Sequence, residues 1–260
     1  MPMITLLTDF GVTDTYVGQM KGVIASVAPG ATVIDLTHAV PPQQIVVGAL
    51  MLDAAVDAFD DDAIHVAVVD PGVGSQRRPL AVRTSHGIYV APDNGLLTAV
   101  LARYRAYQVV ALTNRRYQRT NVSATFHGRD VFAPAAAHLA VGVKLTELGE
   151  PVDPATLVRL DLPQPVRHAE GMTLHVLWVD PFGNLVTDLR AEQLDSDARV
   201  TLDDTTILTI ADTFSDVPVG EPVAYFGSSG RLEIAVRNGS AAARFDAGSG
   251  AVVELRPLVR

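Results

Sequence analysis

The run of apolar residues at 64–69 constrains the fold more than any other stretch of the sequence. A nearly unbroken apolar run of this length is typical of a central parallel strand covered on both faces. It ends at Asp70 and a glycine-rich turn, which Arg77 and Arg78 follow. Because ligands of open α/β sheets bind at the rim where strands end, these side chains are candidates for an active site. The alternative is a turn-capping aspartate paired with a surface arginine, which contributes little to stability.

Strand and helix patterns alternate through the first half of the chain. Short apolar runs predict strands at 4–8, 32–36, 64–69, 80–83, 88–91 and 108–112. Apolar residues at helical spacing predict helices at 16–27, 43–59, 96–101 and 129–141. This alternation predicts an α/β fold, with a mostly parallel, Rossmann-like sheet flanked by helices.

The pattern changes near residue 150. Four prolines between 151 and 165 predict an extended linker. Beyond it, strand patterns separated by turn residues recur at short spacing, with no helical period, which predicts a small β-barrel or sandwich. We therefore expect an α/β catalytic domain at 1–150, a linker at 151–169 and a β-barrel domain at 170–260.

Composition excludes several classes of function. A net charge of −9 argues against a nucleic-acid partner, and the absence of cysteine excludes thiolate metal sites and cysteine nucleophiles. No segment has the length of a membrane span or the pattern of a signal peptide, so we expect a cytoplasmic protein without a membrane partner. No P-loop, dinucleotide motif or metal-ligand spacing occurs, so we expect no metal and no cofactor.

Two further polar clusters adjoin predicted element ends. Asp9 follows the first strand, where a carboxylate either accepts hydrogen bonds from ribose hydroxyls or caps the next helix. His127 precedes a helix together with Arg129 and Asp130. It is either a general base, proton shuttle or substrate donor, or a histidine packed in a loop. We expect the other six histidines to be structural or exposed, because their sequence neighbours are not notably polar.

The predicted β domain carries a cluster that is split between two turns. Phe182 and Asn184 flank Gly183, and the second turn spans 226–231. An aromatic face beside an amide that both donates and accepts suits a purine. For either turn alone, a tight β-turn without a ligand is the favoured interpretation.

Together these motifs resemble those of the S-adenosyl-L-methionine hydroxide adenosyltransferases (S-adenosylmethionine hydrolases), a family related to the fluorinases and chlorinases. The matching segments follow the family's order along nearly the whole chain, at 8–11, 16–22, 69–74, 126–130, 182–184 and 228–235. The resemblance implies an N-terminal α/β domain, a C-terminal β-barrel and a homotrimer with sites between neighbouring subunits.

The resemblance also implies roles for individual residues. Catalytic roles fall on Asp70, Arg77 and His127, with Arg77 favoured over Arg78 by its spacing of seven residues from Asp70. The implied substrate-binding residues are Asp9 for the ribose; Phe182, Asn184 and Phe214 for the purine; and Asp14, Asp180 and Ser228 for the methionine end.

The halogenating relatives differ at positions that this resemblance identifies. They carry tyrosine at the positions of Asp70 and His127, a halide-binding serine at that of Gly128, and, in the fluorinases, tryptophan at that of Gln43. The chain therefore resembles the branch that uses hydroxide.

The implied reaction is hydrolysis of S-adenosyl-L-methionine to adenosine and L-methionine. A sulfonium leaves readily, so the chemistry needs an activated water, which Asp70, Arg77 and His127 can orient and deprotonate. Three alternatives stay open: a non-catalytic module that binds S-adenosylmethionine or adenosine, a metal-dependent hydrolase using Asp9 and Asp70, and a halide-using adenosyltransferase.

Overall fold

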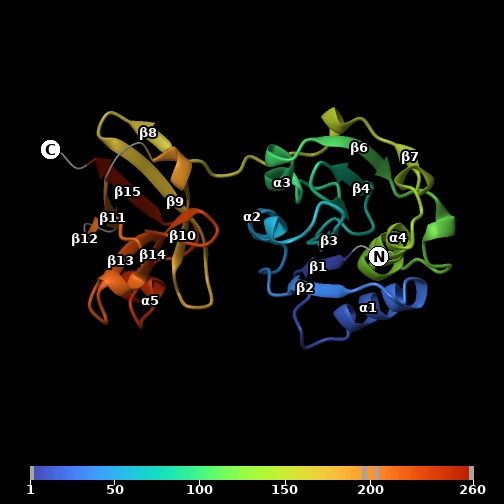
Figure 1. Ribbon diagram of the computed structural model, residues 1–260, viewed down its shortest axis with the longest axis horizontal. Coiled ribbons are helices and arrows are strands. Elements are labelled where there is room, and N and C mark those ends of the chain that lie inside the picture. Colours follow the sequence, from blue (N-terminus) through green and yellow to red (C-terminus); the bar gives the residue numbers. More distant parts are fainter. Residues whose placement is uncertain (1–2, 195–197, 203–204, 258–260) are drawn as a thin grey trace. The chain divides into compact units, whose positions relative to one another are not determined.

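The protein is described by a computed structural model that covers residues 3–194, 198–202 and 205–257. The chain forms two compact units, Met1–Leu162 and Pro163–Arg260 (Figure 1). The proline-rich stretch before and after this division contains a 3₁₀ turn, Pro154–Thr156, and a short strand, β8, Val166–His168.

A seven-stranded sheet organises the N-terminal unit. Its order is β2-β1-β3-β5-β4-β6-β7. The pairs β2–β1, β1–β3 and β3–β5 are parallel, and antiparallel pairs extend the sheet beyond β5. The strands are β1 (Ile4–Thr8), β2 (Val33–Thr37), β3 (Ile64–Val68), β4 (Pro79–Thr84), β5 (Ile88–Pro92), β6 (Ala106–Ala111) and β7 (Glu150–Pro151). The predicted α/β class, with its parallel sheet core, is confirmed.

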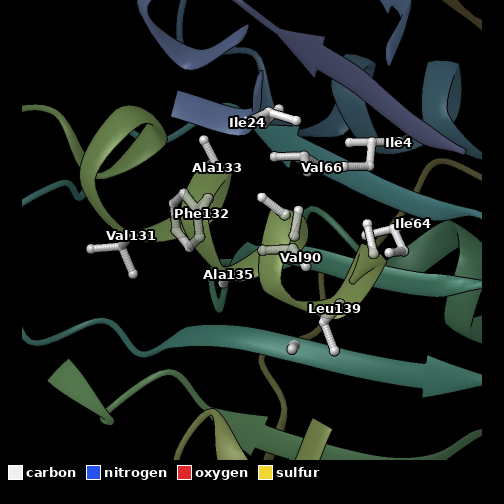
Figure 2. Packing of buried hydrophobic residues seen from close by; sticks show 14 of the residues in the cluster. Ile4, Ile24, Ile64, Val66, Val90, Val131, Phe132, Ala133, Ala135 and Leu139 are labelled. Atoms are coloured by element: carbon white, nitrogen blue, oxygen red, sulfur yellow. The ribbon is translucent and has the colours of Figure 1, made fainter. Parts of the chain in front are cut away.

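Helices cover both faces of this sheet. α1 (Tyr16–Val27) and α4 (Ala133–Ala140) pack together on one face, and α2 (Ile45–Ala55) packs with α3 (Thr98–Arg103) on the other (Figure 1). Figure 2 shows the core under α1 and α4, where strand side chains such as Ile4 and Val66 gather with Phe132. Successive side chains of a strand point to opposite faces of the sheet. Because helices cover both faces, all five residues of β3 are buried, which explains its nearly unbroken apolar sequence.

Two of the other histidines have polar partners from distant parts of the chain, which agrees with the structural role expected for them. His65 on β3 is fully buried, and its Nδ1 lies 2.8 Å from Thr5 Oγ1. Burial lowers its pKa to about 4, so the ring stays neutral near pH 7, stacked on Tyr89. His86 Nδ1 contacts Asp61, again a pairing across the fold that local sequence does not reveal.

The predicted helix at 129–141 begins differently from the expectation. Gly128–Phe132 forms a π-helical turn, in which the Ala133 N–H donates to the Gly128 carbonyl five residues earlier, and α4 follows. Pro134 has no N–H to donate to the Asp130 carbonyl, which instead accepts from the Arg119 N–H at 3.0 Å. Because Pro134 cannot form the regular α-helical hydrogen bond to Asp130, its presence is compatible with the wider π-helical turn.

The C-terminal unit is an antiparallel sheet of eight strands. Its path is β12-β11-β15-β9-β10-β14-β13, with β8 paired to β9. A bridge from Ala211 to Tyr225 brings the chain after β12 to β13, so the sheet nearly closes, and the predicted barrel is confirmed. The strands are β9 (Gly171–Val179), β10 (Leu185–Arg190), β11 (Ala198–Leu202), β12 (Thr205–Thr209), β13 (Pro222–Phe226), β14 (Arg231–Val236) and β15 (Val252–Pro257).

One short helix in this unit was not expected from the sequence. α5, Ala241–Phe245, follows Ser240, whose Oγ accepts a hydrogen bond from the Ala243 N–H at 3.1 Å. A serine before three alanines is an N-cap signal, but five residues are too few to show a helical period.

Candidate functional site

The carboxyl ends of the parallel strands bring polar residues to one edge of the N-terminal sheet. Asp9 follows β1, His38 follows β2, Asp70 lies two residues beyond β3, and Asn94 lies two residues beyond β5. Asn94 Nδ2 donates to the Val69 carbonyl at 2.8 Å and so holds the segment that carries Asp70. This edge is where open α/β sheets bind ligands.

Asp70, Arg77 and His127 form one continuous polar chain. Arg77 Nε lies 3.0 Å from each carboxylate oxygen of Asp70, and its Nη2 donates to Asp70 Oδ2. The same Nη2 lies 2.8 Å from His127 Nδ1. The Asp70 and Arg77 side chains are only 4% and 8% exposed, and the guanidinium carbon lies 5.4 Å from the centroid of the Phe132 ring. The pairing therefore stands in a shielded environment, where charge-assisted hydrogen bonds are strong.

The contact with Arg77 fixes the protonation of His127. A guanidinium only donates, so Nδ1 accepts and the neutral ring carries its proton on Nε2. Burial, together with the positive charge of Arg77, lowers the pKa of His127 below its ordinary value of 6.5. The imidazole is therefore neutral near pH 7, with one nitrogen oriented by the arginine and the other available as a donor.

The neighbouring Arg78 lies in a separate cluster. Its Nε donates to Asp93 Oδ2 at 2.7 Å, and its Nη1 donates to Thr156 Oγ1 at 3.0 Å. The structure thus brings Arg77 rather than Arg78 to Asp70, as the spacing of the two residues suggested.

Arg129 and Asp130, which follow His127, form a structural pair. Arg129 Nε donates to Asp130 Oδ1 at 2.7 Å, and the Asp130 carboxylate is fully buried. Asp130 Oδ2 also accepts from the Ser123 N–H at 2.8 Å. This pair fastens the loop before His127, which is a structural role.

The loop that carries Asp9 is fastened from two sides. Asp9 Oδ2 accepts from the Gln43 N–H at 2.8 Å, and Gln43 has a left-handed backbone with φ of 65°. A non-glycine residue in that region is strained, and here the strain directs an N–H at the carboxylate. On the other side, Thr8 Oγ1 lies 2.8 Å from His38 Nδ1 and accepts from the Phe10 N–H at 3.2 Å.

Asp14 lies further along, in the exposed segment before α1. Its Oδ1 accepts from the Thr15 N–H at 2.6 Å. The helix begins at Tyr16 with Thr15 as N-cap residue, so Asp14 lies one position before the cap. The Asp14 carboxylate is therefore left facing solvent.

Gly128 lies against aromatic and sulfur atoms. A Cβ at this position would lie 3.3 Å from both Met20 Sδ and the Phe10 ring. Contacts that short are tighter than ordinary packing, so any side chain here would require its neighbours to move. Glycine at this position therefore fits the packing around His127.

The five candidate residues of the C-terminal unit line one pocket of about 560 Å³. Phe182 and Phe214 are 78% and 54% exposed, which leaves their ring faces available. The candidates that share the pocket are Asp180, Phe182, Asn184, Phe214 and Ser228.

Asp180 organises the turn that presents Asn184. Its Oδ1 accepts from the N–H groups of Phe182 and Asn184 at 2.8 and 2.9 Å, and its Oδ2 accepts from Asn184 Nδ2 at 2.8 Å. A carboxylate only accepts, so the Asn184 amide must turn its nitrogen toward Asp180 and keep its oxygen for another donor. Both Asp180 oxygens thus accept hydrogen bonds from the turn that Asp180 begins.

Four polar residues of this pocket were not assigned a role from the sequence: Tyr225, Glu233, Arg237 and Asn238. Arg237 Nη1 donates to the carbonyls of Ser215 and Val217 at 3.0 and 2.7 Å, which fastens the 3₁₀ turn beginning at Phe214. The sequence does carry a signal for Glu233, because it alternates with two apolar residues of β14, Leu232 and Ile234. These two are fully buried, so Glu233 points to the opposite face of the sheet.

Two features are absent from the part of the chain that the structure describes. There, no three His, Cys, Asp or Glu side chains gather as a metal site would require. Within the same residues, no helix combines the length and apolar character needed to cross a membrane.

Comparisons with known proteins agree with this architecture. The N-terminal domain model of the SAM hydroxide adenosyltransferases matches residues 4–149, and the C-terminal domain model matches residues 174–254. A protein of Salinispora tropica named (R)-S-adenosyl-L-methionine hydrolase is 43% identical over 93% of this chain and 92% of its own length. A fluorinase of an Actinoplanes species is 29% identical over 90% of each chain.

A solved structure extends the likeness to the fold. The crystal structure of an uncharacterized conserved protein from Thermotoga maritima matches with a TM-score of 0.91 and 35% identity, covering 98% of this chain and all of the other. Both family models together span most of the sequence, in the order of the two structural units. The chain therefore belongs to the SAM hydroxide adenosyltransferase family.

Proposed function

We propose that the protein hydrolyses S-adenosyl-L-methionine to adenosine and L-methionine. The observation that carries this proposal is the buried chain of Asp70, Arg77 and neutral His127 at the ligand-binding edge of the sheet. The relative of Salinispora tropica, whose name gives this activity, supports it.

In the proposed reaction, water attacks the ribose 5′-carbon in line with its bond to sulfur. The oxygen–carbon bond forms, the carbon–sulfur bond breaks, and its electron pair converts the sulfonium into the neutral thioether of methionine. Asp70 takes the proton from the attacking water. Both Asp70 oxygens already accept from Arg77, but a carboxylate offers about four acceptor sites, so capacity for the water is left.

Arg77 and His127 position that water. Arg77 fixes the plane of the carboxylate, and His127 offers its Nε2 proton to an oxygen nucleophile. Holding the nucleophile in line contributes up to about 7–11 kcal/mol in favourable intramolecular reactions. Because attack by hydroxide on a sulfonium neutralises charge, a shielded site favours the transition state more than bulk water does.

We assign substrate binding to both units. In this proposal Asp9 accepts hydrogen bonds from the ribose hydroxyls, Phe182 and Phe214 stack on the purine, and Asn184 reads the purine edge through its free oxygen. Ser228 and Asp14 bind the methionine end, and Asp180 acts through Asn184 and its turn.

The proposal includes assembly and surroundings. We expect a cytoplasmic homotrimer with sites between neighbouring subunits and no metal or other cofactor. Sedimentation equilibrium tests the trimer, and activity in a chelator tests the metal. A monomer at working concentration, or loss of activity in the chelator, would contradict the corresponding part.

The decisive experiment incubates purified protein with S-adenosyl-L-methionine and separates the products by chromatography. Adenosine and L-methionine are expected, and oxygen-18 from labelled water should enter the adenosine 5′-hydroxyl. Binding without turnover would identify a binding module instead. A 5′-halogenated adenosine formed in the presence of halide would identify a halide-using transferase, against which the close packing at Gly128 argues.

A further inference from the structure

Tyr225 and Glu233 form a cross-strand pair inside the C-terminal pocket. They lie directly opposite each other in the antiparallel register of β13 and β14. The Tyr225 hydroxyl donates to Glu233 Oε2 at 3.0 Å, and both residues line the pocket of about 560 Å³. The pair therefore faces the space that the proposed function assigns to substrate.

The Glu233 carboxylate lies close to the backbone of Gly227. An added Cβ on Gly227 would lie 1.9 Å from Glu233 Oε1, so a side chain at position 227 would displace the carboxylate from this place. Oε1 accepts no hydrogen bond from the residues that the structure describes. One oxygen of the acid is thus fixed by tyrosine, and the other keeps its acceptor capacity.

No cation in the described parts of the chain compensates this acid. Arg237, which lines the same pocket, directs its Nη1 to the Ser215 and Val217 carbonyls. The other pocket acid is Asp180; burial of Glu233, together with the Asp180 charge, raises the pKa of Glu233. A half-buried carboxylate with one donor gains stability when a ligand supplies another.

We infer that Glu233 is a specificity-determining residue that accepts a hydrogen bond from an amine of the substrate. This inference rests on the proposed function. S-adenosyl-L-methionine carries two such groups, the exocyclic amine of its purine and the α-ammonium of its methionine. Both groups are nitrogen donors that would satisfy the free acceptor of Glu233, and the experiment separates the two sources.

The test substitutes Glu233→Gln, which preserves the shape and the acceptor for Tyr225 but removes the charge. KM and kcat are measured with S-adenosyl-L-methionine, and dissociation constants are measured by calorimetry with adenosine and inosine. We expect KM to rise about tenfold or more, the range of a charged hydrogen bond, while kcat changes little. Glu254→Gln on β15, where Glu254 bonds Thr173, is the matched control and should change neither quantity.

The two sources predict different binding. If the purine amine is the donor, the wild type prefers adenosine to inosine and Glu233→Gln loses that preference. If the α-ammonium is the donor, adenosine binding stays unchanged while KM for the full substrate rises. Unchanged KM together with an unchanged preference for adenosine would overturn the inference.

The inference and the proposed function fail in distinguishable ways. Failure of the wild type to form adenosine defeats the proposed function, whereas an unchanged KM and an unchanged adenosine preference in Glu233→Gln defeat only the role of Glu233. Circular dichroism checks the fold of the variant. If Glu233→Gln does not fold, Tyr225→Phe supplies the second test: it frees Oε2 without removing the charge, so the same preference for the amine should persist.

Discussion

In the N-terminal unit the Arg77 guanidinium contacts both Asp70 and His127, whereas in the C-terminal pocket the Glu233 carboxylate has one tyrosine donor and no described cation. The Asp70 side chain is nearly buried and Glu233 is half-buried, but only the first is neutralised within its own chain. The first arrangement holds its geometry before substrate arrives. The second becomes fully paired only when a ligand brings the missing donor.

This difference corresponds to two roles of residues in an enzyme, stabilisation of the transition state and binding of the substrate. A paired cluster keeps its shape and can be complementary to the transition state, because little reorganisation is needed during the reaction. An unpaired group gains its partner when substrate binds, and so contributes to affinity and selectivity. We therefore expect changes in the first region to affect kcat and changes in the second to affect KM.

The largest effect is expected from Asp70→Asn. The amide cannot take the proton of water and leaves the Arg77 charge uncompensated, so kcat should fall by about 10²–10⁴-fold, the range for a general base. Stopped assays with chromatographic detection of adenosine give kcat. The control is Asp93→Asn, which breaks the neighbouring pair with Arg78 and should keep kcat. Equal losses in the two variants would contradict the distinction between the two pairs.

A moderate effect is expected from Asp180→Ala. It removes the acceptor that orients the Asn184 amide, so KM should rise roughly five- to tenfold, the size of one neutral hydrogen bond, at nearly constant kcat. Steady-state kinetics measure both constants. Glu192→Ala, an exposed acid in the same unit, serves as control. A fall in kcat without a change in KM would show that the pocket contributes to the chemical step and would contradict the expectation that it affects KM alone.

The smallest effect concerns the titration of His127. Burial and the Arg77 charge favour the neutral ring, so its pKa should lie below 6.5 and rise in Arg77→Gln. Protonation removes the Nδ1 acceptor, so kcat should decline as the pH falls through that lowered pKa and stay level above pH 6.5. Histidine NMR signals, assigned with His127→Asn, report the midpoint. A midpoint above 6.5 in the wild type would contradict the electrostatic account.

Much of the fold followed from periodicity. Buried parallel strands and their terminal polar residues have a clear pattern, so the sequence predicted β1, β3 and the edge carrying Asp9 and Asp70. The resemblance to the family and the residue spacing selected Arg77, and the structure places it at Asp70. These features are encoded by residues close together in the chain.

The missed features depend on residues far apart in the chain. The left-handed Gln43 directs its N–H at a carboxylate 34 positions earlier, which no local pattern announces. Glu233 stands in a strand whose alternation is visible, but its pairing with Tyr225 depends on the register of two strands. Polar partners of this kind arise from tertiary packing, which local preference does not specify.

The π-helical turn at Gly128–Phe132 makes chain length a determinant of this site. Each residue of an α-helix turns the chain by about 100°, so deleting one residue there would restore a regular helix and rotate the preceding segment by that angle. The core contacts of α4 would stay in place while the His127 ring turned away from Arg77. A change of one residue in length, without substitution of any polar group, would thus uncouple the histidine from its partners.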